Sequence, residues 1–378
     1  MMSVELGNTM SFSDEQSMLL DTASEFCKQA APIAEVRDLL LTDKGYRDTV
    51  WQQMVDLGWT GVAVPEEFGG SDLGLAAVVP LSECMGRQLL GSPFVATQLA
   101  TQVLLNGATA QQQAHWLPRI VAGAVGTVAV TEADGSWDLT SVAASSDGGM
   151  LSGTKCLVLD AASAEFLACS VTHKGELAIA LVPVASIPVA QISREVVLDE
   201  TRRSYTVVLD GVEITPEQLI TGSAAHRALN ATQQAAWLLH AADACGGTSA
   251  TVDLVVEYLT TRTQFGRKIG SYQALKHPTV DMLMGYERLR SHVYHAASLL
   301  ASGAPDSDAE LALRMAKAES GEAYNFAADR AIQFHGGFGF TYECDAQLYL
   351  RRALWLNYQF GDTPHHRAIL QNLLLGCV

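Results

Sequence analysis

Three stretches of different hydrophobic period divide this chain of 378 residues. Up to about residue 122, apolar positions recur at the three- and four-residue spacing of helices, and one such pattern runs to Leu57 before Gly58. From about 123 to 218 the period changes to two, with Gly, Asp, Pro and Ser between short runs. From Ala224 onward the pattern is helical again.

The middle stretch contains several β-branched runs in succession, with no helical pattern between them: 126–131, 150–160, 166–171, 177–184 and 204–212. Such an order predicts a small β-barrel or sandwich. We therefore expect an α+β protein with three domains: an N-terminal helical domain (1–122), a middle β domain (123–220) and a C-terminal four-helix bundle (221–378).

Composition and charge narrow the class of protein. With 48% hydrophobic and 17% charged residues, the chain has the composition of a compact globular protein. It has no run of eighteen apolar residues, and residues 1–20 lack the basic start and apolar core of a signal peptide. The net charge of −17 disfavours nucleic acid and anionic lipid. We expect a cytoplasmic protein with no membrane or nucleic-acid partner.

Cysteine and histidine patterns do not indicate a metal site. The seven cysteines are scattered and lack CxxC spacing, which argues against both disulfides and zinc. His365 and His366 are adjacent at the start of a helical pattern, so their side chains point in different directions. We expect no metal.

Two segments of the C-terminal stretch have the residue types of a nucleotide grip. Arg262 ends a long helical pattern, and its guanidinium could hold phosphate oxygens beside the ring of Phe265. Gln333 precedes the pair Gly336 and Gly337, where missing Cβ atoms let a flat or charged ligand approach the backbone. Each segment alone is more typical of a helix end than of a ligand site.

Together, in this order and spacing, the two segments resemble the R-x-x-F-G and Q-x-x-G-G-x-G-F motifs of the acyl-CoA dehydrogenase superfamily. The resemblance covers essentially the whole chain and is most specific over residues 226–363. In that family these motifs contact the adenine and pyrophosphate of an FAD bound mainly to a neighbouring subunit. It implies the following FAD contacts: Arg262, Gln264, Phe265, Gln333, Gly336 and Gly337.

The middle domain resembles the family less closely. Thr131 and Ser136 lie in a segment similar to T-E-P-x-x-G-S-D, whose threonine and serine hold the flavin ring and pyrophosphate. This segment is one residue short, however, and has Ala133 in place of proline, which could put Trp137 where the serine belongs. The family's threonine that bonds flavin N5 is matched by Leu159, which has no hydroxyl to donate.

The reaction of the family, α,β-desaturation of an acyl-CoA, needs a carboxylate base shielded from water. The family's common base is the glutamate of a Y-E-G-T loop, and its position is filled here by Phe360. Other members carry the base on the helix before R-x-x-F-G, where Asp243 is the only ionisable carboxylate between Asn230 and Val252. Small residues around Asp243 would let this helix lie close against a planar ring. The resemblance therefore makes Asp243 the candidate catalytic base.

Three alternatives stay open at this point. Asp243 could be a buried aspartate satisfied by His240, three residues back on the same helical face. Asp362, in a Gly-Asp-Thr turn, is expected to cap a helix and not to act as a base. Flavin oxidases of this fold also use an aspartate base. Any bound CoA would need a local positive site, for which the candidates are Arg202, Arg203, Arg267 and Lys268.

Two functional hypotheses follow from the resemblance. In the first, the chain is an FAD-dependent acyl-CoA dehydrogenase that forms a homo- or heterotetramer and passes electrons to electron-transfer flavoprotein. In the second, it is a non-catalytic or half-site subunit of a heterotetramer, and it completes the FAD site of a paralogous partner. The A-A-D context of Asp243 is similar to subunits of the mixed acyl-CoA dehydrogenases that act on steroid side chains.

Overall fold

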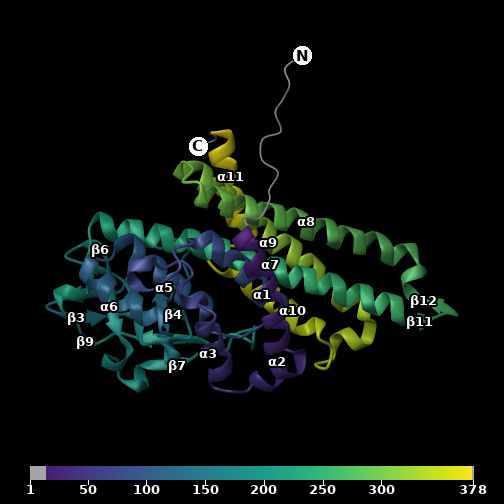
Figure 1. Cartoon of the computed structure of the whole chain (residues 1–378), viewed down its shortest axis with the longest axis horizontal. Coiled ribbons are helices and arrows are strands. Elements are labelled where there is room, and N and C mark those ends of the chain that lie inside the picture. The colour runs from purple at the N-terminus through teal and green to yellow at the C-terminus, as the bar shows by residue number, and fades with distance from the viewer. Residues whose placement is uncertain (1–13, 377–378) are drawn as a thin grey trace, which may run out of the picture.

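The computed structural model describes residues 14–376, in which a helical region, a sheet region and a set of long helices follow one another along the chain (Figure 1). Local sequence sets the start of α6, where Thr109 and Gln112 form a reciprocal capping box. The N-terminal helices are α1 (Asp14–Ala30), α2 (Ile33–Leu39), α3 (Asp48–Asp56), α4 (Val79–Arg87), α5 (Phe94–Gly107) and α6 (Ala110–Val121).

The middle region is a curled sheet whose strands match the five predicted runs and add three short ones. Strands β1 and β2 pair with β5 in parallel, whereas β6 pairs with β5 antiparallel. A separate three-stranded sheet has the order β4-β8-β7. The strands are β1 (Gly126–Ala129), β2 (Ser145–Asp147), β3 (Met150–Ser152), β4 (Thr154–Leu159), β5 (Phe166–His173), β6 (Glu176–Pro183), β7 (Ile192–Arg194), β8 (Ser204–Val208), β9 (Val212–Glu213) and β10 (Leu219–Thr221).

The run 150–160, expected as one strand, is split at Gly153 between two sheets. Gly153 has φ +121, a backbone conformation that favours glycine. A Cβ there would also lie 2.7 Å from Cα of Ala144. The chain therefore changes sheets at this glycine, and β4 is free to pair with β8.

The C-terminal region is built on α7 (Ser223–Thr261), a helix of 39 residues and about 58 Å at about 1.5 Å per residue. The small hairpin of β11 (Thr263–Gln264) and β12 (Arg267–Lys268) lies at its end, remote from the sheet region (Figure 1). Further helices then pack along α7 and one another: α8 (Gln273–Ala301), α9 (Asp306–His335), α10 (Ala346–Tyr358) and α11 (Thr363–Leu375). The α+β architecture is as expected, while the domain boundaries after residues 122 and 220 stay predictions.

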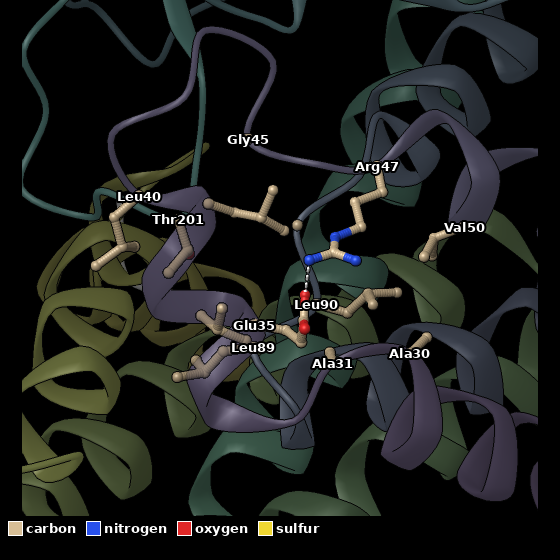
Figure 2. Close-up of a pocket in the computed structure, with 13 residues that line it drawn as sticks. Ala30, Ala31, Glu35, Leu40, Gly45, Arg47, Val50, Leu89, Leu90 and Thr201 are labelled. Carbon is tan, nitrogen blue, oxygen red and sulfur yellow. Dashed lines mark ion pairs between the residues drawn. The ribbon is translucent and has the colours of Figure 1, made fainter.

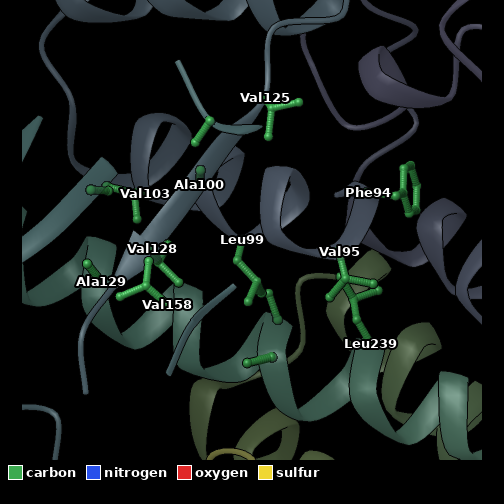
Figure 3. Close-up of a cluster of buried hydrophobic side chains, with 14 of the residues drawn as sticks. Phe94, Val95, Leu99, Ala100, Val103, Val125, Val128, Ala129, Val158 and Leu239 are labelled. Carbon is green, nitrogen blue, oxygen red and sulfur yellow. The ribbon is translucent and has the colours of Figure 1, made fainter. Parts of the chain in front are cut away.

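The three regions share one hydrophobic core where they meet. Figure 3 shows side chains of α5, β1 and α7 converging there. Leu99 of α5 and Leu239 of α7 are 1% and 0% exposed, and Val128 of β1 belongs to the same cluster. This junction fixes the sheet against the middle of α7, so every group on that part of α7 has a set position relative to the sheet.

A buried ion-pair network adds charge to this junction. Asp243 of α7 accepts from Arg202, in the loop before β8, and from Nη1 of Arg352, in α10, at 3.0 Å to each carboxylate oxygen. Arg352 also pairs with Asp199 and donates to the hydroxyl of Thr201. The charges of the two arginines balance those of the two aspartates. All four residues are at most 8% exposed, so the network is shielded from water.

The neighbouring Arg203 is also buried, at 2% exposure. Its guanidinium donates to backbone carbonyls at the end of α2 and beyond, including Leu39, Leu40 and Thr42. The expectation that Arg202 and Arg203 offer a surface site for an anionic ligand is therefore wrong, because both are consumed in internal contacts. Arg267 and Lys268 are exposed.

Among the helices of residues 14–376, none combines the length and the apolar character needed to cross a membrane.

We predict that Arg352→Met destabilises the protein by about 3–5 kcal/mol, because it leaves two buried aspartates without their shared partner. Arg351→Met is the matched control on the same helix, since Arg351 pairs with Glu200 at the partly exposed surface, where loss costs about 0–1 kcal/mol. Urea unfolding of both variants measures the difference. Equal midpoints would show that the network contributes no more than a surface pair.

Candidate active site

The residues predicted to grip FAD lie in two groups at the far end of the long helices. Arg262 follows α7 directly, and Gln264 and Phe265 lie in the hairpin. Phe265 is 91% exposed and has φ +53, in the left-handed backbone region. All three side chains are exposed to solvent.

The second group lies beside the first, as the sequence resemblance implies. The rings of Tyr258, near the end of α7, and His335, at the end of α9, stack with centroids 4.1 Å apart. This contact brings Gln333, Gly336 and Gly337 to the same end of the bundle as Arg262. A Cβ at either glycine would meet no atom within 4 Å, so the backbone there is open to a ligand.

A small cavity, of about 20 Å³, lies at the other group of predicted residues, where α5, β1, β4 and the loop after α10 meet. Thr131 is in its wall, as expected for a flavin-ring contact. Ser136 is not among the lining residues; its hydroxyl accepts from the backbone N–H of Asp138 at 3.2 Å. The lining residues are Ala96, Leu99, Thr127, Val128, Val130, Thr131, Leu157, Leu159, Gln359 and Phe360.

Thr127 is a wall residue that sequence reasoning missed. It is 0% exposed and its hydroxyl has no hydrogen-bond partner among the described residues. A buried hydroxyl without a partner is costly, so a ligand in the cavity would satisfy it. The sequence offered one signal for Thr127, a polar residue within a buried strand. Whether its side chain faces the cavity depends on the register of β1, which the sequence does not give.

The residues 359–363, which we call the 359–363 loop, separate α10 from α11. Phe360 has φ +55 and its side chain is in the cavity wall. The carboxylate of Asp362 accepts from the backbone N–H of His365 at 2.9 Å, which confirms Asp362 as the cap of α11. Within this loop, therefore, the single carboxylate is engaged by a helix end.

The carboxylate of Asp243 does not line this cavity; it is 1% exposed and held by Arg202 and Arg352. The alternative that His240 satisfies Asp243 is wrong, because the partners are the two arginines and His240 Nδ1 has no hydrogen-bond partner within residues 14–376. The assignment of Asp243 as the base stays a prediction. It would require a guanidinium to release one oxygen, since a base needs a free lone pair to take a proton.

Two buried bases stand close to the 359–363 loop. The ring of His240 lies 5.6 Å from that of Phe360, and burial, together with the nearby Lys317, holds the pKa of His240 well below 6.5. Burial also lowers the pKa of Lys317 to about 7. Lys317 donates to the carbonyls of Leu356, Asn357 and Gly361, so it acts as a tether for the loop.

The small residues around Asp243 serve helix packing. A Cβ at Gly246 would clash with the backbone of Glu83 in α4, and one at Gly247 would clash with the ring of Tyr324 in α9. Gly86 of α4 meets the backbone of Asp243 in the same way. The expectation that these small residues face a flat ligand is therefore wrong.

A second small cavity, of about 20 Å³, lies among α2, α3 and the end of α4 (Figure 2). Its walls are mostly apolar, and Arg47 and Glu35 form an ion pair across it. Thr201, which bonds Arg352, is also in its wall. None of the residues predicted to bind FAD or act as base lines this cavity, so it is separate from the candidate site.

The two groups of predicted FAD residues lie at different places in the fold. Arg262, at the end of α7, is about 28 Å along the helix from Asp243, beside which the sheet region packs. The exposed grip and the open glycines fit the nucleotide half of an FAD, and the unpartnered Thr127 hydroxyl with Thr131 fits a polar ring edge.

Comparison with known proteins identifies the family. Residues 13–124 match the acyl-CoA dehydrogenase N-terminal domain, and residues 226–375 match the acyl-CoA dehydrogenase C-terminal domain. The chain is 29% identical over 344 residues to the acyl-CoA dehydrogenase IpdE2 of Mycobacterium tuberculosis, covering 90% of this chain and 91% of that protein.

Solved structures agree over nearly the full length. A variant of the Tcur3481-Tcur3483 steroid ACAD is 26% identical with a TM-score of 0.83, covering 96% of this chain and 98% of that one. The ChsE4-ChsE5 complex from Mycobacterium tuberculosis shares the fold, with 22% identity, a TM-score of 0.86 and coverage of 97% and 99%. This chain thus belongs to the acyl-CoA dehydrogenase family of FAD-dependent oxidoreductases that act on CH–CH bonds.

Proposed function

We propose that this chain is a subunit of a heteromeric acyl-CoA dehydrogenase in which it completes the FAD site of a paralogous neighbour. The observation that carries the proposal is the contrast between the two groups of site residues. At the bundle end, Arg262 and Phe265 are exposed and ready for a nucleotide. In the chain's own cavity, Phe360 and Leu159 stand where the family has a base and a flavin donor.

Within the assembly, the chain's residues bind and orient the nucleotide. The Arg262 guanidinium is suited to hold phosphate oxygens in bidentate fashion, and Phe265 offers a ring face to the adenine. The open backbone at Gly336 and Gly337 lets the pyrophosphate approach N–H groups closely. FAD supplies the hydride acceptor that no side chain provides, and electron-transfer flavoprotein is the proposed electron acceptor.

A bulky acyl-CoA, such as a steroid side-chain thioester, is the proposed substrate class. The support is the similarity to a pair of proteins named a steroid ACAD, and the fold shared with the two-component ChsE4-ChsE5 complex. Both names join two components, which also supports a heteromeric assembly.

A second candidate is a self-sufficient dehydrogenase that uses Asp243 as its base. The observation in its favour is that Asp243 is a buried carboxylate on α7, one helical turn from His240, whose ring contacts Phe360. Desolvation of this kind is what a base for an α-proton needs. The obstacle is that both of its oxygens already accept from arginines.

We predict that Arg262→Ala, in the chain co-purified with its paralogous partner, weakens FAD binding by about 10- to 100-fold, because a charge-assisted phosphate contact is worth about 1.5–3 kcal/mol. Arg119→Ala is the control, since Arg119 pairs with Glu165 on the surface of α6. Titration of the apoprotein with FAD measures both affinities. Equal affinity of the two variants would contradict the proposed grip.

The role of Asp243 is tested by comparing Asp243→Asn with Asp199→Asn, because both aspartates are 1% exposed and both pair with Arg352. If Asp243 serves the ion-pair network, both variants lose unfolding free energy and keep equal turnover per folded, FAD-loaded enzyme. A base would instead show itself as a selective loss of about 10²- to 10⁴-fold in turnover for Asp243→Asn. Thermal unfolding and single-turnover flavin reduction provide the two measurements.

A further inference from the structure

The 359–363 loop and the last turn of α10 are held by side-chain donors from three other elements. Lys317 of α9 donates to the carbonyl oxygens of Leu356, Asn357 and Gly361 at 3.0, 3.1 and 2.9 Å. Nε1 of Trp237, in α7, donates to the carbonyl of Phe360 at 2.8 Å. In the family this loop carries the base. Here these donors hold the backbone of the loop at the position where Phe360 replaces the base.

The third donor comes from the other side of the cavity. Trp137 follows β1 in the segment similar to T-E-P-x-x-G-S-D, and its indole N–H donates to the carbonyl of Tyr358 at 3.0 Å. Its ring also meets the ring of His365 edge to face, with centroids 5.1 Å apart. Trp137 therefore joins the segment after β1 to the end of α10 and the start of α11.

These contacts explain the backbone of Phe360. A phenylalanine with φ +55 is in the left-handed region, which is costly for a residue with a Cβ and persists where the surroundings fix it. Here Trp237 and His366 both lie within hydrogen-bond distance of the Phe360 carbonyl. The side chain is consequently held in the cavity wall, next to Leu159 and Thr131.

The two segments in which this chain differs from the family are thus joined by a hydrogen bond. Trp137 interrupts the flavin-binding segment, Phe360 replaces the base, and Trp137 binds the backbone two residues before Phe360. A thioester in this cleft would need the space between the flavin seat and this loop. In this structure the space holds only a small cavity, whose lining is mostly apolar and includes Leu157, Leu159 and Phe360.

We propose that Trp137 is a latch that closes this chain's own cleft to acyl-CoA, with Phe360 as the plug. The inference rests on the proposed function, since it places the reaction in the neighbouring subunit's cleft. Lys317 and Trp237 hold the loop to helices of the same bundle, and Trp137 ties the residue just before the loop, Tyr358, to the sheet region. Trp137 and Phe360 are therefore specificity-determining residues: they exclude a substrate class from one cleft of the assembly.

Hydrogen–deuterium exchange of the full-length chain tests the latch directly. Trp137→Phe keeps an aromatic ring at this position and removes the indole N–H donor. Amide exchange should then rise by about fivefold in both 132–140 and 355–362, as expected for one lost hydrogen bond. The matched control is Trp237→Phe, which also removes a donor to the loop. It should raise exchange in 355–362 and leave 132–140 unchanged. Unchanged exchange of both segments in Trp137→Phe would overturn the latch.

Ligand exclusion is tested by calorimetric titration with octanoyl-CoA. The natural chain should show no saturable binding, and the double variant Trp137→Ser, Phe360→Ala should gain it. Equal binding by both proteins, or binding by neither, overturns the exclusion. The FAD affinity of Arg262→Ala does not depend on this result. The latch can therefore be disproved while the shared FAD site stands, and the shared FAD site can be disproved while the latch stands.

Discussion

The buried pairing of Asp243 with Arg202 and Arg352 is the constraint on which the arrangement of the site depends. It connects α7, α10 and the loop before β8, three segments far apart in the sequence. Arg352 extends the connection to Asp199, so the two positive and two negative charges balance without water. Removing any one member would leave a buried charge uncompensated, which costs more than the intact network contributes. Asp243 is therefore held in place between α7, α10 and the loop before β8.

The length of α7 determines how the chain can take part in catalysis. A straight helix of this length carries the Arg262 grip away from the sheet region, and the hairpin with Phe265 extends beyond it (Figure 1). The proposed grip is exposed at this tip, where a second chain could reach it. At the inner end, Lys317 and Trp237 hold the 359–363 loop, and Trp137 bonds Tyr358 just before it. Under the proposed function, the chain has a nucleotide half-site at its tip and an altered site in its centre.

The sequence predicted the architecture and the local signals well, because these depend on periodicity and on turn residues. The changes of period near residues 123 and 220 predicted the sheet region and the long helices after it. Asp362 as a helix cap was also predictable, since a cap involves neighbours in the chain. The sequence did not predict the partners of Asp243, because Arg202 and Arg352 come from distant segments. The contact of Trp137 with the last turn of α10 was not predictable either, because it also joins segments far apart in the sequence.

We infer that this chain needs a paralogous subunit to form a working flavin site. The most direct measurement is the flavin content and acyl-CoA-dependent dye reduction of the chain purified alone and of the chain co-purified with its paralogue. We expect a colourless, inactive protein alone, and a yellow, active complex when the two are together. A chain that by itself binds FAD at one per subunit and reduces the dye at the rate of the complex would contradict it.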